Sequence, residues 1–306
     1  MKKIIITTML VFAFSVSFGC DICGCGVGSY YLGILPDFKK RFMGLRYQHK
    51  GLTTHISPDG TMSYLTNEET YQTVELWGAF NVGERFRVMG FVPYNFNERI
   101  NQGKQTGKNG MGDIAVQGYY KLFDKKKTAG KKLLVQTLWV GGGIKLPIGE
   151  YDPADENINQ NTQNTFQLGT GSVDFTVNAM YDVRLQDAGI NANISYKMNT
   201  ANKYNYQYGN KFTANALAYY KINIKNKITI APNTGLMYET AQKDFKNISH
   251  TVDESGGFST MATFGAEFSV KQISFGGNYQ TPLSQELAGN RVLAKDRFML
   301  HVSFSL

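Results

Sequence analysis

The sequence predicts an all-β fold, a transmembrane antiparallel β-barrel of the outer-membrane type, and three observations carry this prediction. Residues 298–306 alternate strictly between apolar and polar side chains, and the same period recurs along most of the chain. Many of the alternating stretches approach the roughly nine to eleven residues that a tilted membrane-spanning strand requires. Short and long connections also alternate, as periplasmic turns and outer loops do in such barrels.

The alternation predicts about 12 strands, within a range of about 10 to 14, and an even number is typical of single-chain bacterial barrels. Pro93 and Pro232 fall inside two of these stretches. Each proline removes a ladder hydrogen bond, so we expect those strands to be shorter or bulged. The predicted strands are residues 42–50, 70–82, 85–96, 112–123, 132–146, 172–185, 189–198, 211–224, 227–240, 257–269, 271–280 and 295–306.

The chain divides into three predicted parts. Residues 1–19 have a basic start, a short apolar core and small residues before a cut site, which is typical of a secretory signal peptide. Residues 20–38 form a cysteine-containing segment, which could act as a short plug or a metal site. Residues 39–306 form the barrel, whose predicted place is the outer membrane of a Gram-negative cell.

Composition agrees with a barrel that has one apolar and one wet face. The chain contains 32 Gly, 18 Tyr and 20 Phe, and its mean hydropathy is negative. The net charge of +8 could suggest nucleic acid, but the basic residues are scattered and form no basic helix. We therefore expect no nucleic-acid partner.

If apolar side chains face lipid, a set of charged side chains faces the lumen. Their signs are mixed, so ion pairs across a narrow lumen are expected and no ion selectivity is implied. The predicted lumen-lining residues are Arg46, Glu75, Arg87, Lys121, Lys145, Asp174, Asp182, Arg184, Lys197, Lys221, Glu267 and His301.

His301 and Ser303 share one face of the last predicted strand, which raises the alternative of an outer-membrane lipid hydrolase. A nucleophile also needs an orienting group behind its base and an oxyanion site, and the sequence assigns neither. Polar lumen lining is the better interpretation, and we expect no catalytic residue and no enzyme.

All three cysteines crowd into the segment from Cys20 through Cys23 to Cys25. Cys20 could accept an N-terminal lipid, Cys23 and Cys25 could form a disulfide in the oxidising periplasm, or all three could bind Cu(I) or Zn²⁺ through thiolates. The mildly apolar stretch that follows, to Asp37, could fold back into the lumen as a plug.

Several glycine-rich motifs occur in order along the middle of the chain. They are Gly110-Met-Gly-Asp113, Tyr119-Tyr-Lys121, Gly143-Ile-Lys-Leu-Pro-Ile-Gly149, Leu168-Gly-Thr-Gly-Ser172 and Tyr208-Gly-Asn210. Over residues 109–238 the chain resembles the outer-membrane transporters grouped as the MetA-pathway of phenol degradation family. The cysteine-rich start followed by Tyr31 to Phe38 resembles a Bacteroidetes subgroup of such transporters.

The resemblance implies an architecture related to the long-chain fatty-acid transporter, with an N-terminal plug, and uptake of small hydrophobic or aromatic solutes. We therefore predict a passive outer-membrane channel for such solutes. The alternatives are a metal-handling barrel that uses the cysteine cluster and the lipid hydrolase. The expected partners are outer-membrane lipids, a small hydrophobic solute and, during biogenesis, the barrel assembly machinery.

Overall fold

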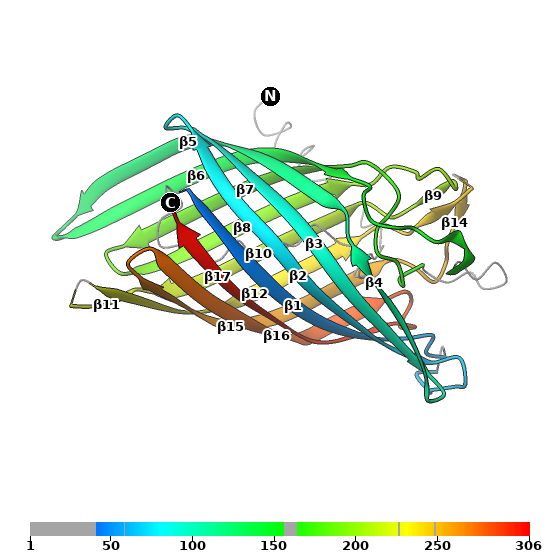
Figure 1. The fold of residues 1–306 in the computed structure, drawn as a ribbon. Helices are drawn as coiled ribbons and strands as arrows, with labels where there is room; N and C mark the ends of the chain where they lie inside the picture. The colour runs from blue at the N-terminus through cyan, green and yellow to red at the C-terminus, as the bar shows by residue number, and fades with distance from the viewer. Residues whose placement is uncertain (1–40, 58, 156–163, 226, 248) are drawn as a thin grey trace, which may run out of the picture.

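The computed structural model describes residues 41–57, 59–155, 164–225, 227–247 and 249–306, which form a closed antiparallel β-barrel of twelve strands (Figure 1). Neighbouring wall strands pair in chain order, β10 pairs with β12, and β1 pairs with β17, so the sheet closes on itself. The predicted fold class and strand number are therefore confirmed. The wall strands are β1 (Phe42–Thr54), β2 (Asn67–Val82), β3 (Phe86–Asn101), β5 (Ile114–Ala129), β6 (Lys132–Leu146), β7 (Asp174–Leu185), β8 (Ala188–Met198), β10 (Lys211–Tyr220), β12 (Ile228–Ala241), β15 (Gly257–Val270), β16 (Ile273–Leu287) and β17 (Leu293–Ser305).

The other elements extend the wall or cap one end of it. Strand β4 (Lys104–Met111) forms a hairpin with β3. Strand β11 (Ile222–Ile224) follows β10 and pairs with the first residues of β12. Short strands β9 (Tyr206–Gln207), β13 (Phe245–Lys246) and β14 (His250–Thr251) form a separate small sheet, and Pro153–Asp155 is a 3-10 turn. In the described ranges no helix has the length and apolarity needed to cross a bilayer.

Side chains alternate between an exposed apolar face and a buried face. In β17, the exposed side chains from Phe298 to Leu306 are all apolar, whereas Arg297, His301 and Ser303 are buried. A one-layer barrel buries only its inner face, so this alternation separates a lipid-facing surface from a polar lumen.

Pro93 and Pro232 do not shorten the strands that contain them. Instead, one of the strands paired with each of these strands is interrupted opposite the proline. Pro93 lies within β3, where the pairing with β5 has ended and the pairing with β4 begins. Pro232 lies within β12, between the segments paired with β10 and with β11. A proline has no N–H to donate, so the adjacent strand breaks where that bond would be. This break also divides the single strand predicted over residues 211–224.

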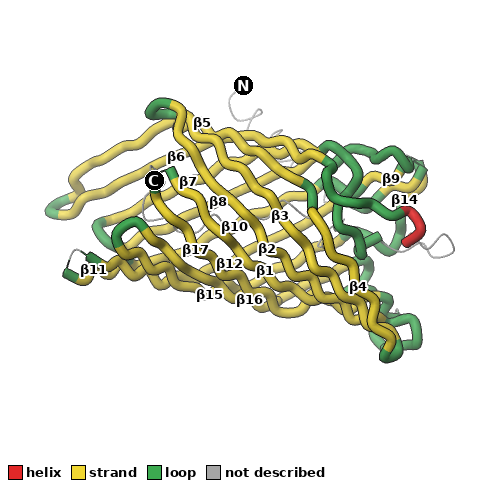
Figure 2. The backbone as a smooth tube through the Cα atoms, viewed as in Figure 1, coloured by secondary structure: helices red, strands yellow, loops and turns green. Residues whose placement is uncertain are grey.

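The two ends of the barrel differ (Figure 2). Short turns join strands at the end that holds the start of β1 and the C-terminus, and the longer connections gather at the other end. In outer-membrane barrels the short turns are periplasmic, so we assign the loop end to the cell exterior.

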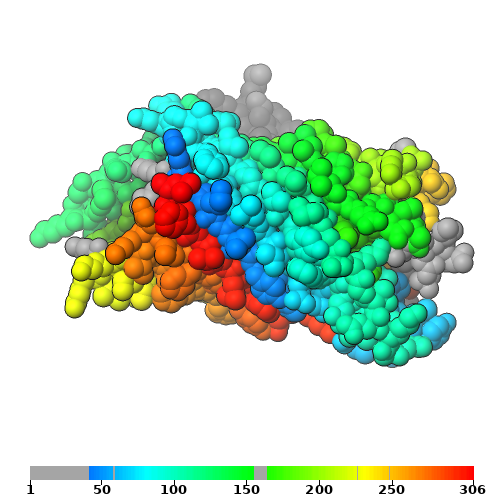
Figure 3. Space-filling model, viewed as in Figure 1, coloured from blue at the N-terminus to red at the C-terminus, as the bar shows by residue number. Residues whose placement is uncertain are grey.

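The β5–β6 connection differs from the prediction. Residues 124–131 are expected as a turn, but β5 continues to Ala129 and pairs with β6 up to Ala129↔Lys132. The resulting hairpin extends beyond the rim (Figure 3). Most of its residues are exposed on both faces, so no alternation marks them as a strand in the sequence.

Candidate functional site: the lumen and its inward segment

The loop between β6 and β7 contributes a fully buried stretch, residues 164–170, which we call the inward segment. Two asparagines on the lumen face of β3 hold its backbone. Asn95 Nδ2 donates to the Leu168 carbonyl at 3.0 Å, and Asn97 Nδ2 donates to the Gln167 carbonyl at 2.9 Å. A loop with its carbonyls bonded to inward side chains lies inside the barrel wall, not above it.

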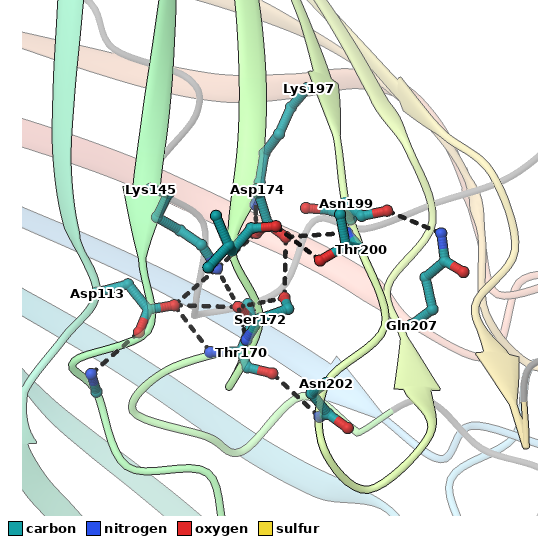
Figure 4. Close-up of polar contacts among 12 residues, drawn as sticks. Asp113, Lys145, Thr170, Ser172, Asp174, Lys197, Asn199, Thr200, Asn202 and Gln207 are labelled. Carbon is teal, nitrogen blue, oxygen red and sulfur yellow. Dashed lines mark hydrogen bonds and ion pairs between the residues drawn. The ribbon is translucent and has the colours of Figure 1, made fainter.

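Asp113 anchors the end of the inward segment (Figure 4). Its Oδ1 accepts from the Gly149 amide at 3.0 Å, and its Oδ2 accepts from the Thr170 amide at 2.9 Å. Lys145 Nζ bonds Asp113 at 2.7 Å and pairs with Asp174 at 2.5 Å, and it also donates to Thr170 Oγ1. These charges are buried and mutually paired, which is the arrangement that a low-dielectric site tolerates.

Three motifs that are distant in the sequence meet at this point. Gly110-Met-Gly-Asp113 supplies the carboxylate, the stretch that ends at Gly149 supplies one amide, and Leu168-Gly-Thr-Gly-Ser172 supplies the other. The glycines make room, because a Cβ at Gly169 would collide with Asp113 and with the Gly149 backbone. The motifs therefore encode the loop anchor.

A second anchor holds the other end of the inward segment. Thr165 Oγ1 donates to Glu69 Oε2 at 2.8 Å, and Arg99 Nε donates to Glu69 Oε1 at 2.8 Å. The Arg99 guanidinium lies 4.3 Å from the ring centroid of Phe166, which adds a cation–π contact. Glu69 thus joins the strand wall to the loop.

Phe166 connects the inward segment to a different part of the wall. It belongs to one buried apolar cluster with Leu52 of β1, Met237 of β12, Met261 of β15 and Leu287 of β16. The anchors come from β2, β3 and the ends of β5 and β6, so the inward segment crosses the lumen. It narrows the lumen near the exterior end.

The periplasmic half of the lumen is lined differently, by buried aromatic and sulfur-containing side chains. The cluster comprises Phe42, Trp77, Ala79, Met89, Phe91, Ala115, Tyr119, Trp139 and Met180. The Arg46 guanidinium lies 5.1 Å from the Trp77 ring centroid, and it pairs with Glu75. An apolar inner surface is unusual for a barrel whose lumen holds only water.

The predicted lumen-lining residues fall into two groups. Four lie half-buried toward the periplasmic rim: Lys121, Asp182, Arg184 and Lys221. The other eight are buried, with relative exposure of 6% or less: Arg46, Glu75, Arg87, Lys145, Asp174, Lys197, Glu267 and His301. Ion pairs join several of the second group, as in Lys145–Asp174 and His301–Glu267 at 3.0 Å.

For the hydrolase alternative, an acid lies beside the base His301, but in the part of the chain that the structure describes Ser303 makes no hydrogen bond with His301. His301 Nε2 lies 3.0 Å from Glu267 Oε1, whereas Ser303 Oγ donates to the Ser274 carbonyl at 3.5 Å. A Cβ at Gly276 would collide with the Glu267 carboxylate, so this glycine gives the pair its space. The arrangement is that of a buried polar contact.

The signal peptide and the cysteine cluster are predictions that the structure leaves untested. Cys20, Cys23 and Cys25, with the whole of residues 1–40, lie outside the described residues. Among the residues that are described, no group of three or more His, Cys, Asp and Glu side chains is arranged to hold a metal ion.

His55 lies in the loop after β1, at the exterior end of the barrel. Its Nδ1 lies 3.1 Å from Asn67 Nδ2, so the neutral ring accepts that amide's hydrogen. Burial lowers the pKa of His55 below 6.5; the charge of Glu69 opposes this shift, and the charge of Arg99 adds to it. A lowered folded pKa means that stability is present above pH 6.5 and is lost as pH falls below it.

We therefore expect amide protons of residues around His55 to exchange with solvent faster at pH 5.5 than at pH 7.5, after correction for the intrinsic pH dependence. Asn tolerates the positive φ of 59° found at this residue, so His55→Asn should remove the pH effect without straining the loop. The exposed His250 serves as the control, because His250→Asn should leave the effect intact. An unchanged protection between the two pH values would contradict the assignment.

Sequence reasoning missed several residues that build the site. Asp113 and the inward segment lie in stretches without alternation, so period-two analysis does not detect them. Glu239, Lys211 and Arg297 do lie on inward faces of alternating strands. A systematic count of inward charges would have found these three.

The fold and the lumen together define a class. A closed barrel with an apolar outer face, short turns at one end and long loops at the other, and a lumen crossed by an inward segment is an outer-membrane channel of a Gram-negative cell. The family model described as "Putative MetA-pathway of phenol degradation" matches residues 49–284. The chain belongs to this family, and the match extends well beyond the stretch from which the resemblance was inferred.

Solved structures support the fold. The COG4313 outer membrane channel from Pseudomonas putida F1 is 12% identical, with a TM-score of 0.60 over 90% of this chain and 100% of that chain. The β domain of the Bordetella autotransporter BrkA is 11% identical, with a TM-score of 0.51 over 87% of this chain and 100% of that chain. Comparison with curated proteins gives no match.

Proposed function

We propose that this channel passes small hydrophobic or aromatic solutes passively across the outer membrane. The observation that carries the proposal is the buried aromatic lining of the periplasmic half, with Trp77 and Phe91 on the lumen side of the paired strands β2 and β3 and Trp139 on the lumen side of β6. Such a surface lowers the free energy of an apolar solute relative to water. The lipopolysaccharide layer slows apolar molecules that would cross a phospholipid bilayer readily, so a protein route for them is useful.

Two further parts of the proposal concern partners. The exposed apolar band contacts outer-membrane lipids. Phe304 and Leu306, which are exposed at the C-terminal end, supply the signal by which the barrel assembly machinery receives the chain during biogenesis.

The test uses proteoliposomes whose outer leaflet contains lipopolysaccharide, so that the background flux of apolar probes is low. We expect phenol and toluene to enter faster than arabinose through the wild-type channel. Trp77→Ala should reduce this aromatic-to-sugar ratio several-fold, because it removes the largest fully buried ring and opens the lumen to polar solutes.

Two controls accompany the flux measurement. Trp77→Phe retains an aromatic ring and should preserve most of the ratio, and Phe80→Ala removes an outward-facing ring and should leave it unchanged. Equal entry of arabinose and of the aromatic probes through the wild-type channel, or no entry of any of them, would overturn the proposal.

A further inference from the structure

We propose that Arg297 forms a binding site for the carboxylate of an anionic hydrophobic solute inside the lumen. This inference rests on the proposed function and narrows it, because it assigns a charge to some of the solutes. Arg297 lies on the inner face of β17 and is 9% exposed. Its Nη1 donates to Glu239 Oε1 at 3.0 Å.

The edge of the Arg297 guanidinium that carries Nε and Nη2 is the part that would bind the carboxylate. The buried Nε and Nη2 of Arg297 have no hydrogen-bond partner within the described residues. These two donors are parallel and form the side-on fork that fits a carboxylate with two hydrogen bonds. A buried fork without an acceptor is costly unless an anion or water occupies it.

The surrounding charge favours an anion. Glu239 is 1% exposed and is shared between Arg297 and Lys211, whose Nζ lies 3.4 Å from Glu239 Oε2. Two cations therefore face one carboxylate. Lys50, the cross-strand neighbour of Arg297 on β1, adds to the positive field at Glu239. Glu239 itself shows that this cluster accepts a carboxylate.

The surface next to Arg297 is apolar, so the part of the ligand other than its carboxylate is expected to be apolar as well. Gln280 is the cross-strand partner of Arg297, and its Nε2 donates to Met237 Sδ at 3.1 Å. Met237 and Met261 belong to the same apolar cluster as Phe166 of the inward segment. A ligand with its carboxylate on Arg297 would thus place an aromatic or aliphatic body against methionine side chains, which adapt to varied shapes. The ligand class is a hydrophobic monocarboxylate.

The experiment compares two probes that differ only in charge. The full chain in detergent is titrated calorimetrically with 4-phenylbutyrate and with 4-phenylbutyramide at pH 7.5. We expect the carboxylate to bind about ten-fold more tightly than the amide, because a charge-assisted forked pair is stronger than neutral hydrogen bonds. Arg297→Gln should bring the ratio close to one, and Arg297→Lys, which keeps the charge but lacks the fork, should give an intermediate ratio.

A second variant is expected to change the carboxylate-to-amide affinity ratio in the opposite direction. Glu239→Gln removes the internal carboxylate that occupies Nη1, so it should raise the ratio above that of the wild type. Arg85→Gln removes one positive charge from the exposed periplasmic rim and should leave the ratio unchanged. Heat-modifiable migration on gels identifies any variant that fails to fold, in which case the remaining variants decide.

The outcomes separate this inference from the proposed function. If the amide binds and the carboxylate binds no better, or if Arg297→Gln and Arg297→Lys leave the ratio unchanged, the Arg297 site is wrong while aromatic passage stands. If neither probe binds and the aromatic flux test also fails, both proposals fall.

Discussion

Val302→Arg is expected to lower the free energy of unfolding by about 2–4 kcal/mol, because it places a charge at the middle of the lipid-facing band. The outward side chains of β17 from Phe298 to Leu306 are apolar, and the exposed Asp296 lies just beyond them. Val302 is the central member of this set and is 47% exposed to the outside. Urea titration of the barrel in lipid vesicles, followed by tryptophan fluorescence, measures the change.

The matched control is Ile273→Arg. Ile273 is also an outward β-branched residue, but it begins β16 directly after the turn at Lys271. An arginine there can reach the aqueous interface, so the expected cost is at most about 1 kcal/mol. Equal costs at the two positions would contradict the placement of the membrane band.

Asp113→Ala is expected to open the channel. Asp113 accepts hydrogen bonds from the Gly149 amide, the Thr170 amide and the Thr170 hydroxyl. Only the two bonds from Thr170 hold the inward segment itself, and losing them at about 1 kcal/mol each would shift the balance between the closed and released inward segment by roughly 30-fold. Single-channel recording in planar bilayers should show this as a large rise in open probability.

Asp113→Ala does not leave Lys145 without a counter-charge, because Lys145 keeps its ion pair with Asp174. The barrel wall should therefore stay folded while the loop anchor is lost. Asp253→Ala serves as the control, since Asp253 is an exposed loop carboxylate paired with Lys243 at 3.2 Å. A conductance trace for Asp113→Ala that matches the wild type would show that the inward segment does not gate the lumen.

The sequence predicted the wall of the barrel well because burial repeats there. Residues 298–306 alternate since one face meets lipid and the other meets the lumen, and the same physical constraint acts on each spanning strand. The prolines were harder to interpret. Pro93 and Pro232 leave their own strands intact, and the missing N–H affects the neighbouring strand, which the sequence does not identify.

The site was predictable only in part. Lys145, Asp174, Glu267 and His301 were predicted as lumen residues from inward-facing positions alone. Their partners depend on strand order and on loop course: Asp113 meets Thr170 across 57 residues of chain, and Arg297 meets Glu239 across 58. Periodicity contains no information about such contacts, and the inward segment has no period at all.

Among the described residues, the β5–β6 hairpin has an unpaired strand edge, which is a place where neighbouring barrels in a crowded membrane could associate. Beyond Tyr120 of β5 and before Leu134 of β6, the described chain places no wall strand alongside the hairpin. The β5 arm continues for about 30 Å past that point, and such bare strand edges invite another sheet to add on. Six lysines occupy residues 121–132. Charge on an edge disfavours strand addition, so we expect these lysines to oppose self-association of the hairpin and the joining of neighbouring barrels through their periplasmic edges.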